Sequence, residues 1–300
     1  MHNLHTNFVK MLEICNKFGK QFTKDKGNIP RRGVVPQTSD LEVIALNLTA
    51  EALSIDSESL LFNKLNSDCK ANFPTLISRR QYNDRKKNLF ELTNKIRRCI
   101  AEDIDELEDT YCIDSKPFEV CRLARSKRNV IGKNDYKKAP SMGYCASQYR
   151  YYFGYKLHIL CGIRGVVHSF DLTKASVHDI HYLKDIKTQI ADCTIIGDKG
   201  YLSASVQLNL FETANIRLEV PLKTNQKDYK PQFYLFKKFR KRVETLFSQM
   251  DDQFMLTRNY AKDIQGVFIR VLSKITAVTA LQYLNKINNK PVGQLKYALC

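Results

Sequence analysis

Apolar side chains in the N-terminal third of the chain recur at the spacing of amphipathic helices. After Ser39 they stand three and four positions apart, and Glu42 completes the S-x-x-E pattern that caps a helix N-terminus. This pattern predicts a helix over about residues 39–53. A second amphipathic segment covers residues 57–68, and an S-x-x-Q pattern at residues 78–81 predicts the start of a third helix.

From about residue 105 the pattern changes to short apolar runs that alternate with helical stretches. Alternation of large apolar side chains with smaller or polar ones is typical of a strand with one buried face, whereas an unbroken apolar run suits a strand covered on both faces. The predicted order is a strand at 111–113 that ends at Asp114, a hairpin of strands at 153–161 and 166–172, a helix at 175–186, strands at 193–197 and 218–223, and a long helix from about residue 235.

This order of elements indicates a fold class. A meander of three strands followed by alternating helices and strands is the order of the ribonuclease H-like fold, in which the active site lies beyond the strand ends. We therefore expect an α/β protein whose ribonuclease H-like mixed sheet is flanked by helices. The acidic residues at 103–109 are expected to mark a surface boundary between this part and the helical N-terminal part.

The charge of the chain indicates its partner. Lys and Arg number 48 against 31 Asp and Glu, so the net charge is +17 and the pI is about 9.4. This excess predicts an acidic partner, and a long polyanion such as double-stranded DNA is the simplest candidate. We identify no apolar run near the roughly 20 residues that span a bilayer and no signal peptide, so we expect no membrane partner and a cytoplasmic protein. None of the nine cysteines has the C-x-x-C spacing of a zinc ribbon or redox motif.

Basic residues are also concentrated locally. The predicted helix after Ser78 carries several of them, which suggests a helix-turn-helix whose third helix lies along DNA, although such a charge run is often only a solvated face. The predicted domains are thus a helical, helix-turn-helix-like DNA-binding region at 1–104 and a catalytic domain at 105–300. The residues expected to bind DNA are Arg79, Arg80, Arg85, Arg125, Arg128, Lys199 and Arg240, with Lys223, Lys227 and Lys230 lining the DNA path.

Three acids stand at informative places in these elements. Asp114 and Asp198 each follow a short apolar run, and Glu244 lies beside the apolar stripe of the last predicted helix. Taken singly, the two aspartates suit strand-ending turns and Glu244 suits an ion pair with Arg240. Taken together, they predict carboxylates that place Mg²⁺ against phosphates in a basic surface.

Several stretches of sequence carry a family resemblance. They are RRGVVPQTSDLEVIALNLTAE near the N-terminus, YCIDSKPFEVCR around Asp114, YFGYKLHILCG, TKASVHDIHYL, IIGDKGYL around Asp198 and KRVETLFSQM around Glu244. With these motifs the chain resembles a DDE transposase of a bacterial insertion sequence. Arg240 and Glu244 also fit the Tyr-Arg-Glu-Lys signature found in many relatives, although other residues, Lys237 and Asp251, stand where its Tyr and Lys would be.

The resemblance implies a function and a site. It implies an enzyme that binds the terminal inverted repeats of its element and catalyses metal-dependent DNA cleavage and strand transfer. The implied catalytic and metal-binding residues are Asp114, Asp198 and Glu244, which would hold two Mg²⁺ ions, for which Mn²⁺ may substitute. A homodimer in the DNA complex is also implied. Two alternatives stay open: a non-catalytic DNA-binding protein derived from a transposase, and a ribonuclease H-like nuclease without strand transfer.

Overall fold

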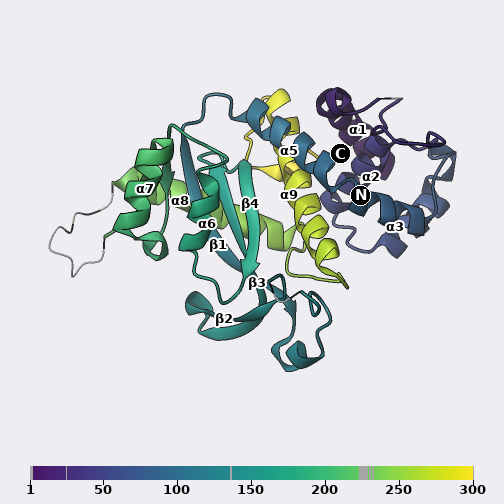
Figure 1. Cartoon of the computed structure of the whole chain (residues 1–300). Helices are drawn as coiled ribbons and strands as arrows, with labels where there is room; N and C mark the ends of the chain where they lie inside the picture. The colour runs from purple at the N-terminus through teal and green to yellow at the C-terminus, as the bar shows by residue number, and fades with distance from the viewer. Residues whose placement is uncertain are drawn as a thin grey trace. The chain divides into compact units, whose positions relative to one another are not determined.

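The computed structural model describes residues 3–24, 26–135, 137–222, 229, 231 and 233–299. The chain divides into two compact units (Figure 1). The first comprises Met1–Ile104, Gln249–Leu256 and Gln265–Cys300, and the second comprises Asp105–Ser248 and Thr257–Ile264. The C-terminal segment thus belongs to the same unit as the N-terminal residues. Lys223, Lys227 and Lys230 lie outside the described residues.

The second unit is built on a six-stranded sheet. Three of its strands form an antiparallel meander, and two further strands run parallel to the first of these. The spatial order is β2-β3-β1-β5-β6, and β4 also pairs with β3. This confirms the predicted ribonuclease H-like mixed sheet. The strands are β1 Thr110–Cys121, β2 Ser141–Cys145, β3 Arg150–Gly162, β4 Val167–Lys174, β5 Cys193–Ile196 and β6 Ile216–Glu219.

Helices cover the sheet because its strands are apolar on both faces. On one face, alternate residues of β1 such as Tyr111 and Ile113 pack with Leu183 of α6 Ile180–Ile186 and Leu210 of α7 Ala204–Ala214. The intervening residues of β1 point to the other face. There the Lys116 ammonium lies 5.9 Å from the ring centroid of Phe247, which belongs to the long helix α8 Tyr234–Asp252.

The first unit is helical, as predicted for the N-terminal residues. It contains α1 Leu4–Gly19, α2 Asp40–Ala52, α3 Glu58–Asp68, α4 Arg79–Asn88, α5 Phe90–Ile104 and, from the C-terminal segment, α9 Ile264–Ile287. Both predicted caps are confirmed: Ser39 forms a reciprocal capping box with Glu42, and Ser78 forms one with Gln81.

Helix α9 corrects the expectation that no segment is long and apolar enough to span a bilayer. Among the described residues, this 24-residue helix passes that test by length and composition. However, 78% of its most apolar window is buried inside the structure, as in the core helix of a soluble protein.

Four other expectations were wrong in detail. Strand β1 does not end at Asp114, because β3 pairs with it as far as Cys121. The predicted helix at 175–186 begins only at Ile180, and the predicted strand at 218–223 is found at Ile216–Glu219. The acidic stretch at 103–109 is not wholly at the surface, because Asp105 is buried. Its carboxylate oxygens lie 2.7 Å from the Arg164 guanidinium and 3.1 Å from His168 Nε2.

Candidate active site

The strand register brings the first two acids together. Strands β1 and β5 run parallel, and their last aligned pair is Cys112 with Ile196. Asp114 and Asp198 each stand two residues beyond this pair. Because side chains two apart in a strand point to the same face, both carboxylates lie where β5 parts from β1. This is the edge at which open α/β sheets place their sites.

Backbone amides hold both carboxylates. The Ser115 N–H donates to Asp114 Oδ1 at 2.8 Å. The Gly200 N–H donates to Asp198 Oδ1, also at 2.8 Å, so that Asp198 caps the short 3-10 helix Lys199–Tyr201. A side chain at position 200 would start 3.0 Å from the same oxygen, which explains why glycine fits beside this carboxylate.

Helix α8 adds the third acid and a cation to the environment of Asp114. The pKa of Asp114 is raised from 3.8 to about 6, mainly by burial and in addition by the negative charges of Asp198 and Glu244. The Ser115 amide and the Arg240 guanidinium act in the opposite direction. Asp198, Arg240 and Glu244 therefore all lie within electrostatic reach of Asp114. Glu244 is exposed and Arg240 is half-buried.

A fourth carboxylate, that of Asp179, lies beside these acids. Its Oδ1 accepts from Ser115 Oγ at 3.1 Å and pairs with Lys156 Nζ at 3.0 Å. Its Oδ2 lies 3.8 Å from the position that a Cβ would take at Gly200. Asp179 stands in the TKASVHDIHYL motif, but the sequence alone gave it no role, because its partners lie 64 and 23 positions away.

Tyr201 contributes an unpaired polar atom to this place. Its side chain is buried, and its hydroxyl has no hydrogen-bond partner among the described residues. Burial raises the pKa of Tyr201 well above its usual value, and the charges of Asp179, Asp114 and Asp198 add to the effect. The phenol is therefore protonated, and its O–H group lies near the three carboxylates.

The carboxylates at this place are suitable ligands for divalent cations, although they do not surround a cation completely. Among the residues that the structure describes, no three His, Cys, Asp or Glu side chains stand close enough together to hold one ion. Mg²⁺, however, prefers carboxylate oxygens and usually takes only one or two of them, with water and substrate phosphates completing its shell. Asp114, Asp198 and Glu244 offer such oxygens around one strand end.

The predicted DNA-binding residues of this unit lie in two settings. Lys199 is exposed next to Asp198, and Arg240 faces Asp114. Arg125 and Arg128 are exposed on the 3-10 helix Leu123–Arg128, which follows β1. The structure therefore brings Lys199 and Arg240 to the carboxylates and places the other two in the segment between β1 and β3.

In the helical unit, the three predicted arginines of α4 have different surroundings. Arg79 and Arg80 are exposed, and Arg79 donates to Ser59 of α3. Arg85 instead donates to Asp40 at 2.6 Å and to the Thr38 carbonyl at 2.8 Å. Its guanidinium thus joins α4 to α2, and we leave Arg85 out of the proposed DNA-binding set.

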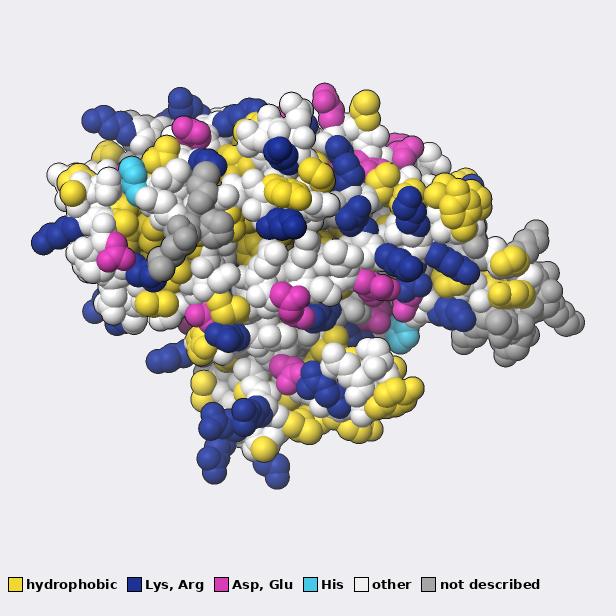
Figure 2. Space-filling model, turned by 180° about the vertical axis from the view of Figure 1, so that it is seen from behind, with side chains coloured by type: hydrophobic (Ala, Val, Ile, Leu, Met, Phe, Trp, Pro, Cys, Tyr) yellow, Lys and Arg dark blue, Asp and Glu magenta, His cyan; other side chains and the backbone are white. Residues whose placement is uncertain are grey.

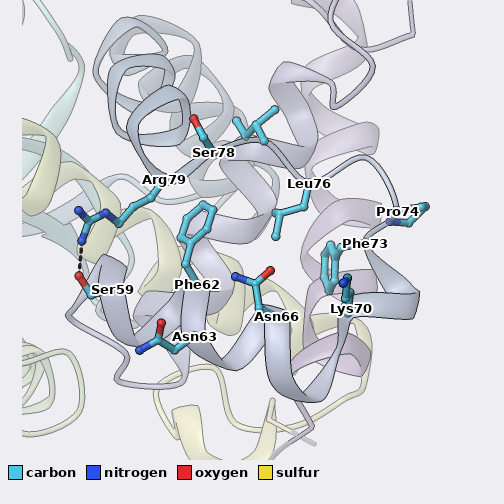
Figure 3. Close-up of a pocket in the computed structure, with 11 residues that line it drawn as sticks. Ser59, Phe62, Asn63, Asn66, Lys70, Phe73, Pro74, Leu76, Ser78 and Arg79 are labelled. Carbon is cyan, nitrogen blue, oxygen red and sulfur yellow. Dashed lines mark hydrogen bonds between the residues drawn. The ribbon is translucent and has the colours of Figure 1, made fainter.

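A pocket opens beside Arg79 (Figure 3). It has a volume of about 770 Å³ and lies between α3 and the segment that leads into α4. Its polar lining includes Asn63, Asn66 and Lys70, and none of the described residues that line it is acidic. It therefore adds uncharged and basic groups to the same surface as Arg79.

Comparison with known proteins identifies the family. A model of the transposase DDE domain matches residues 105–280, which is more than half of the chain and includes Asp114, Asp198 and Glu244. Comparisons with curated proteins and with solved structures gave no match. On the strength of this domain match, the chain belongs to the DDE transposase family.

Proposed function

We propose that this transposase binds the terminal inverted repeats of an insertion sequence and catalyses DNA cleavage and strand transfer at them. The observation that best supports the proposal is that Asp198, which follows β5, and Glu244 of α8 both act on the carboxyl group of Asp114 in β1. The first and last of these acids are 130 positions apart in the chain. If the three acids were only solvated surface residues, they would not need to lie close together.

In this proposal Asp114, Asp198 and Glu244 bind two Mg²⁺ ions, which Mn²⁺ can replace. Such ions activate the attacking oxygen of a phosphodiester exchange and stabilise the leaving oxygen. The raised pKa of Asp114 supports the assignment, because burial first and the nearby carboxylates second disfavour its ionisation until cations bind.

The neighbouring residues orient the carboxylates and the DNA. The amides of Ser115 and Gly200 each fix one carboxylate oxygen, which leaves the second oxygen of Asp114 and of Asp198 for ligand binding. In this proposal Arg240 and the exposed Lys199 contact phosphate oxygens next to the scissile bond. The Tyr201 hydroxyl is a further donor at the same place.

DNA binding is proposed for both units. Arg79 and Arg80 in residues 1–104, and Arg125 and Arg128 in the other unit, are exposed cations suited to the phosphate backbone. The protein is proposed to act in the cytoplasm and as a homodimer in the DNA complex, so that two element ends can be processed together.

The proposal is tested with purified protein, labelled DNA that carries the ends of its element, and Mg²⁺ or Mn²⁺. We expect the wild type to cut and join these ends only with metal, and Asp198→Asn to bind the same DNA without cutting it. Cutting without joining would favour a nuclease. Binding without cutting by the wild type would favour a non-catalytic DNA-binding protein.

A further inference from the structure

The hairpin formed by β2 and the first half of β3 has an unusual outer face. Its inner face carries Gly143, Cys145 and Tyr152, and the last two pack with Ala175. An antiparallel ribbon covered on one side normally presents polar side chains on the other. Here the outer face instead carries four large apolar or aromatic side chains, Met142, Tyr144, Tyr151 and Phe153.

The two outer tyrosines form an exposed pair. Tyr144 and Tyr151 are directly opposite in the register, and their ring centroids lie 5.0 Å apart. The side chains of Tyr144 and Tyr151 are 50% and 63% exposed, and Met142 beside them is 44% exposed. About half of each of these three side chains is exposed, so the rings remain accessible to a ligand.

The segment around this face is strongly basic. Residues 122–150 contain eight Lys and Arg but one acidic residue, Asp135. Within the described part of the segment, Lys138 pairs with Asp135 and Arg150 with Glu119. Among the remaining cations, Arg125, Lys127 and Arg128 are exposed and form no ion pair with a described residue. In Figure 2, Lys and Arg side chains and hydrophobic side chains gather on the lobe at the bottom of the view, which contains β2.

Charge decides which occupant fits this face. A second copy of the chain would bring its own surplus of 17 positive charges against a segment with the same sign. A nucleic acid strand brings phosphates for the cations and flat bases for the rings, and tyrosine stacks on any base. Bases within an intact duplex are already stacked on each other, so a base with a free face is required.

We propose that the outer face of the β2–β3 hairpin binds unpaired bases of the DNA substrate, which stack on Tyr144 and Tyr151 while Arg125, Lys127 and Arg128 bind the adjoining phosphates. This inference rests on the proposed function, because the bases that it assigns to the hairpin belong to the DNA on which the transposase is proposed to act. It separates two roles: the rings select DNA with exposed bases, and the cations bind any DNA.

The test measures fluorescence anisotropy of labelled DNA with the full-length protein. One DNA is a blunt element-end duplex, and the other is the same duplex with four unpaired nucleotides at its 3′ end. Relative to wild type, Tyr144→Ala with Tyr151→Ala is expected to weaken binding of the overhang DNA by roughly 5- to 100-fold and to leave blunt-duplex binding nearly unchanged. Tyr144→Phe with Tyr151→Phe should bind like wild type, because stacking requires the ring and not the hydroxyl.

Two controls keep the result specific. Tyr297→Ala removes a tyrosine that is 51% exposed in the other unit and should change neither affinity. Neutralising Arg125, Lys127 and Arg128 should weaken the binding of both DNAs and make the affinity less dependent on salt. The tyrosine variants should have the same salt dependence as wild type. Thermal unfolding of each variant identifies any loss that comes from misfolding.

The outcomes separate this inference from the proposed function. Suppose that wild type binds the blunt element end and that the double alanine variant binds each DNA as tightly as wild type does. The hairpin inference is then wrong, and the proposed function stands. Dimer loss in the double alanine variant, with unchanged DNA binding, would reassign the face to contact between copies and also overturn the inference. If wild type binds neither DNA, both proposals fail.

Discussion

At the scale of single residues, the carboxyl group of Asp114 holds a proton more tightly than an ordinary aspartate does. Its pKa of about 6 reflects burial first and the neighbouring acids Asp198 and Glu244 second. Since the unfolded chain would have an ordinary value near 3.8, the ionised carboxylate destabilises the metal-free fold. Below pH 3.8 the group is protonated in both states and has no such effect. The destabilisation grows between these two values and is complete above about pH 6.

We therefore predict that Asp114→Asn stabilises the protein when metal is chelated. At pH 7.5 the free energy of unfolding should rise by about 2–3 kcal/mol, as an upper estimate from the pKa difference, and at pH 3.5 it should not change. Denaturant unfolding at the two pH values measures this, with Glu212→Gln, an exposed acid on α7, as the control. A variant that is less stable than wild type at pH 7.5 would contradict the account of Asp114.

Asp179 gives a second prediction at this scale. It accepts from Ser115 Oγ, and the amide of Ser115 fixes Asp114, so that Asp179 positions a carboxylate proposed to bind metal. Asp179→Asn should raise the Mg²⁺ concentration for half-maximal cleavage by roughly 10- to 100-fold, as loss of such supporting groups typically does. Saturating metal and Asp179→Glu should each restore part of the rate. A fall in rate that is the same at every metal concentration would point to a purely structural role.

At the scale of elements, the sequence predicted the parts that local patterns determine. The capping boxes at Ser39 and Ser78 and the β3–β4 hairpin were predictable from spacing, whereas strand β2 was not predicted. The end of β1 was not, because pairing with β3 continues past the polar Asp114. Asp179 was missed for a similar reason, since only folding brings it to Ser115. The assignment of the three acids to a metal site stays a prediction, and it rests on the apolar run that each of them follows or borders.

Helices α2 and α4 are joined by one buried acid. Asp40 is fully buried, and Arg85 and Arg31 both donate to it. Burial alone would raise the pKa of Asp40, but hydrogen bonds from Arg85, Arg31 and the Ile29 amide outweigh it and lower the pKa. A lowered pKa means that the stabilisation is present above the ordinary value of about 3.8 and is lost as the pH falls through the folded-state value below it.

We predict that Arg85→Met lowers the free energy of unfolding by about 3–5 kcal/mol at pH 7, because it leaves a buried carboxylate with one cation fewer. The matched control is Arg80→Met on the same helix, where the exposed side chain should make a difference of at most about 0.5 kcal/mol. Urea unfolding of both variants checks this. Equal effects of the two substitutions would refute the structural role of Arg85.

At the scale of the whole molecule, the helical unit depends on the C-terminal segment. Nearly every residue of α9 between Gly266 and Asn285 is buried. The Lys274 ammonium on α9 donates to Glu51 of α2 and to the Phe254 carbonyl, each at 2.6 Å, and Asn47 of α2 donates to Ser273 at 2.7 Å. Without α9 these polar groups and a large apolar surface would be exposed together.

Residues 1–104 on their own should therefore fail to fold cooperatively. We expect a fragment with this range to give a broad, weak thermal transition by circular dichroism, and to bind DNA far more weakly than the full-length protein does. The full-length protein is the control. A sharp transition and full DNA affinity in the fragment would show that α9 is dispensable for this unit.

The proposed function depends on the binding of the catalytic metal by Asp114, Asp198 and Glu244. The most direct measurement is DNA cleavage by Asp114→Cys, Asp198→Cys and Glu244→Cys in Mg²⁺ and in Mn²⁺, because Mn²⁺ accepts a thiolate more readily than Mg²⁺ does. We expect each variant to bind DNA, to be inactive with Mg²⁺ and to regain part of its activity with Mn²⁺. Cleavage with Mg²⁺ at the wild-type rate in any of the three would contradict the role given to that residue.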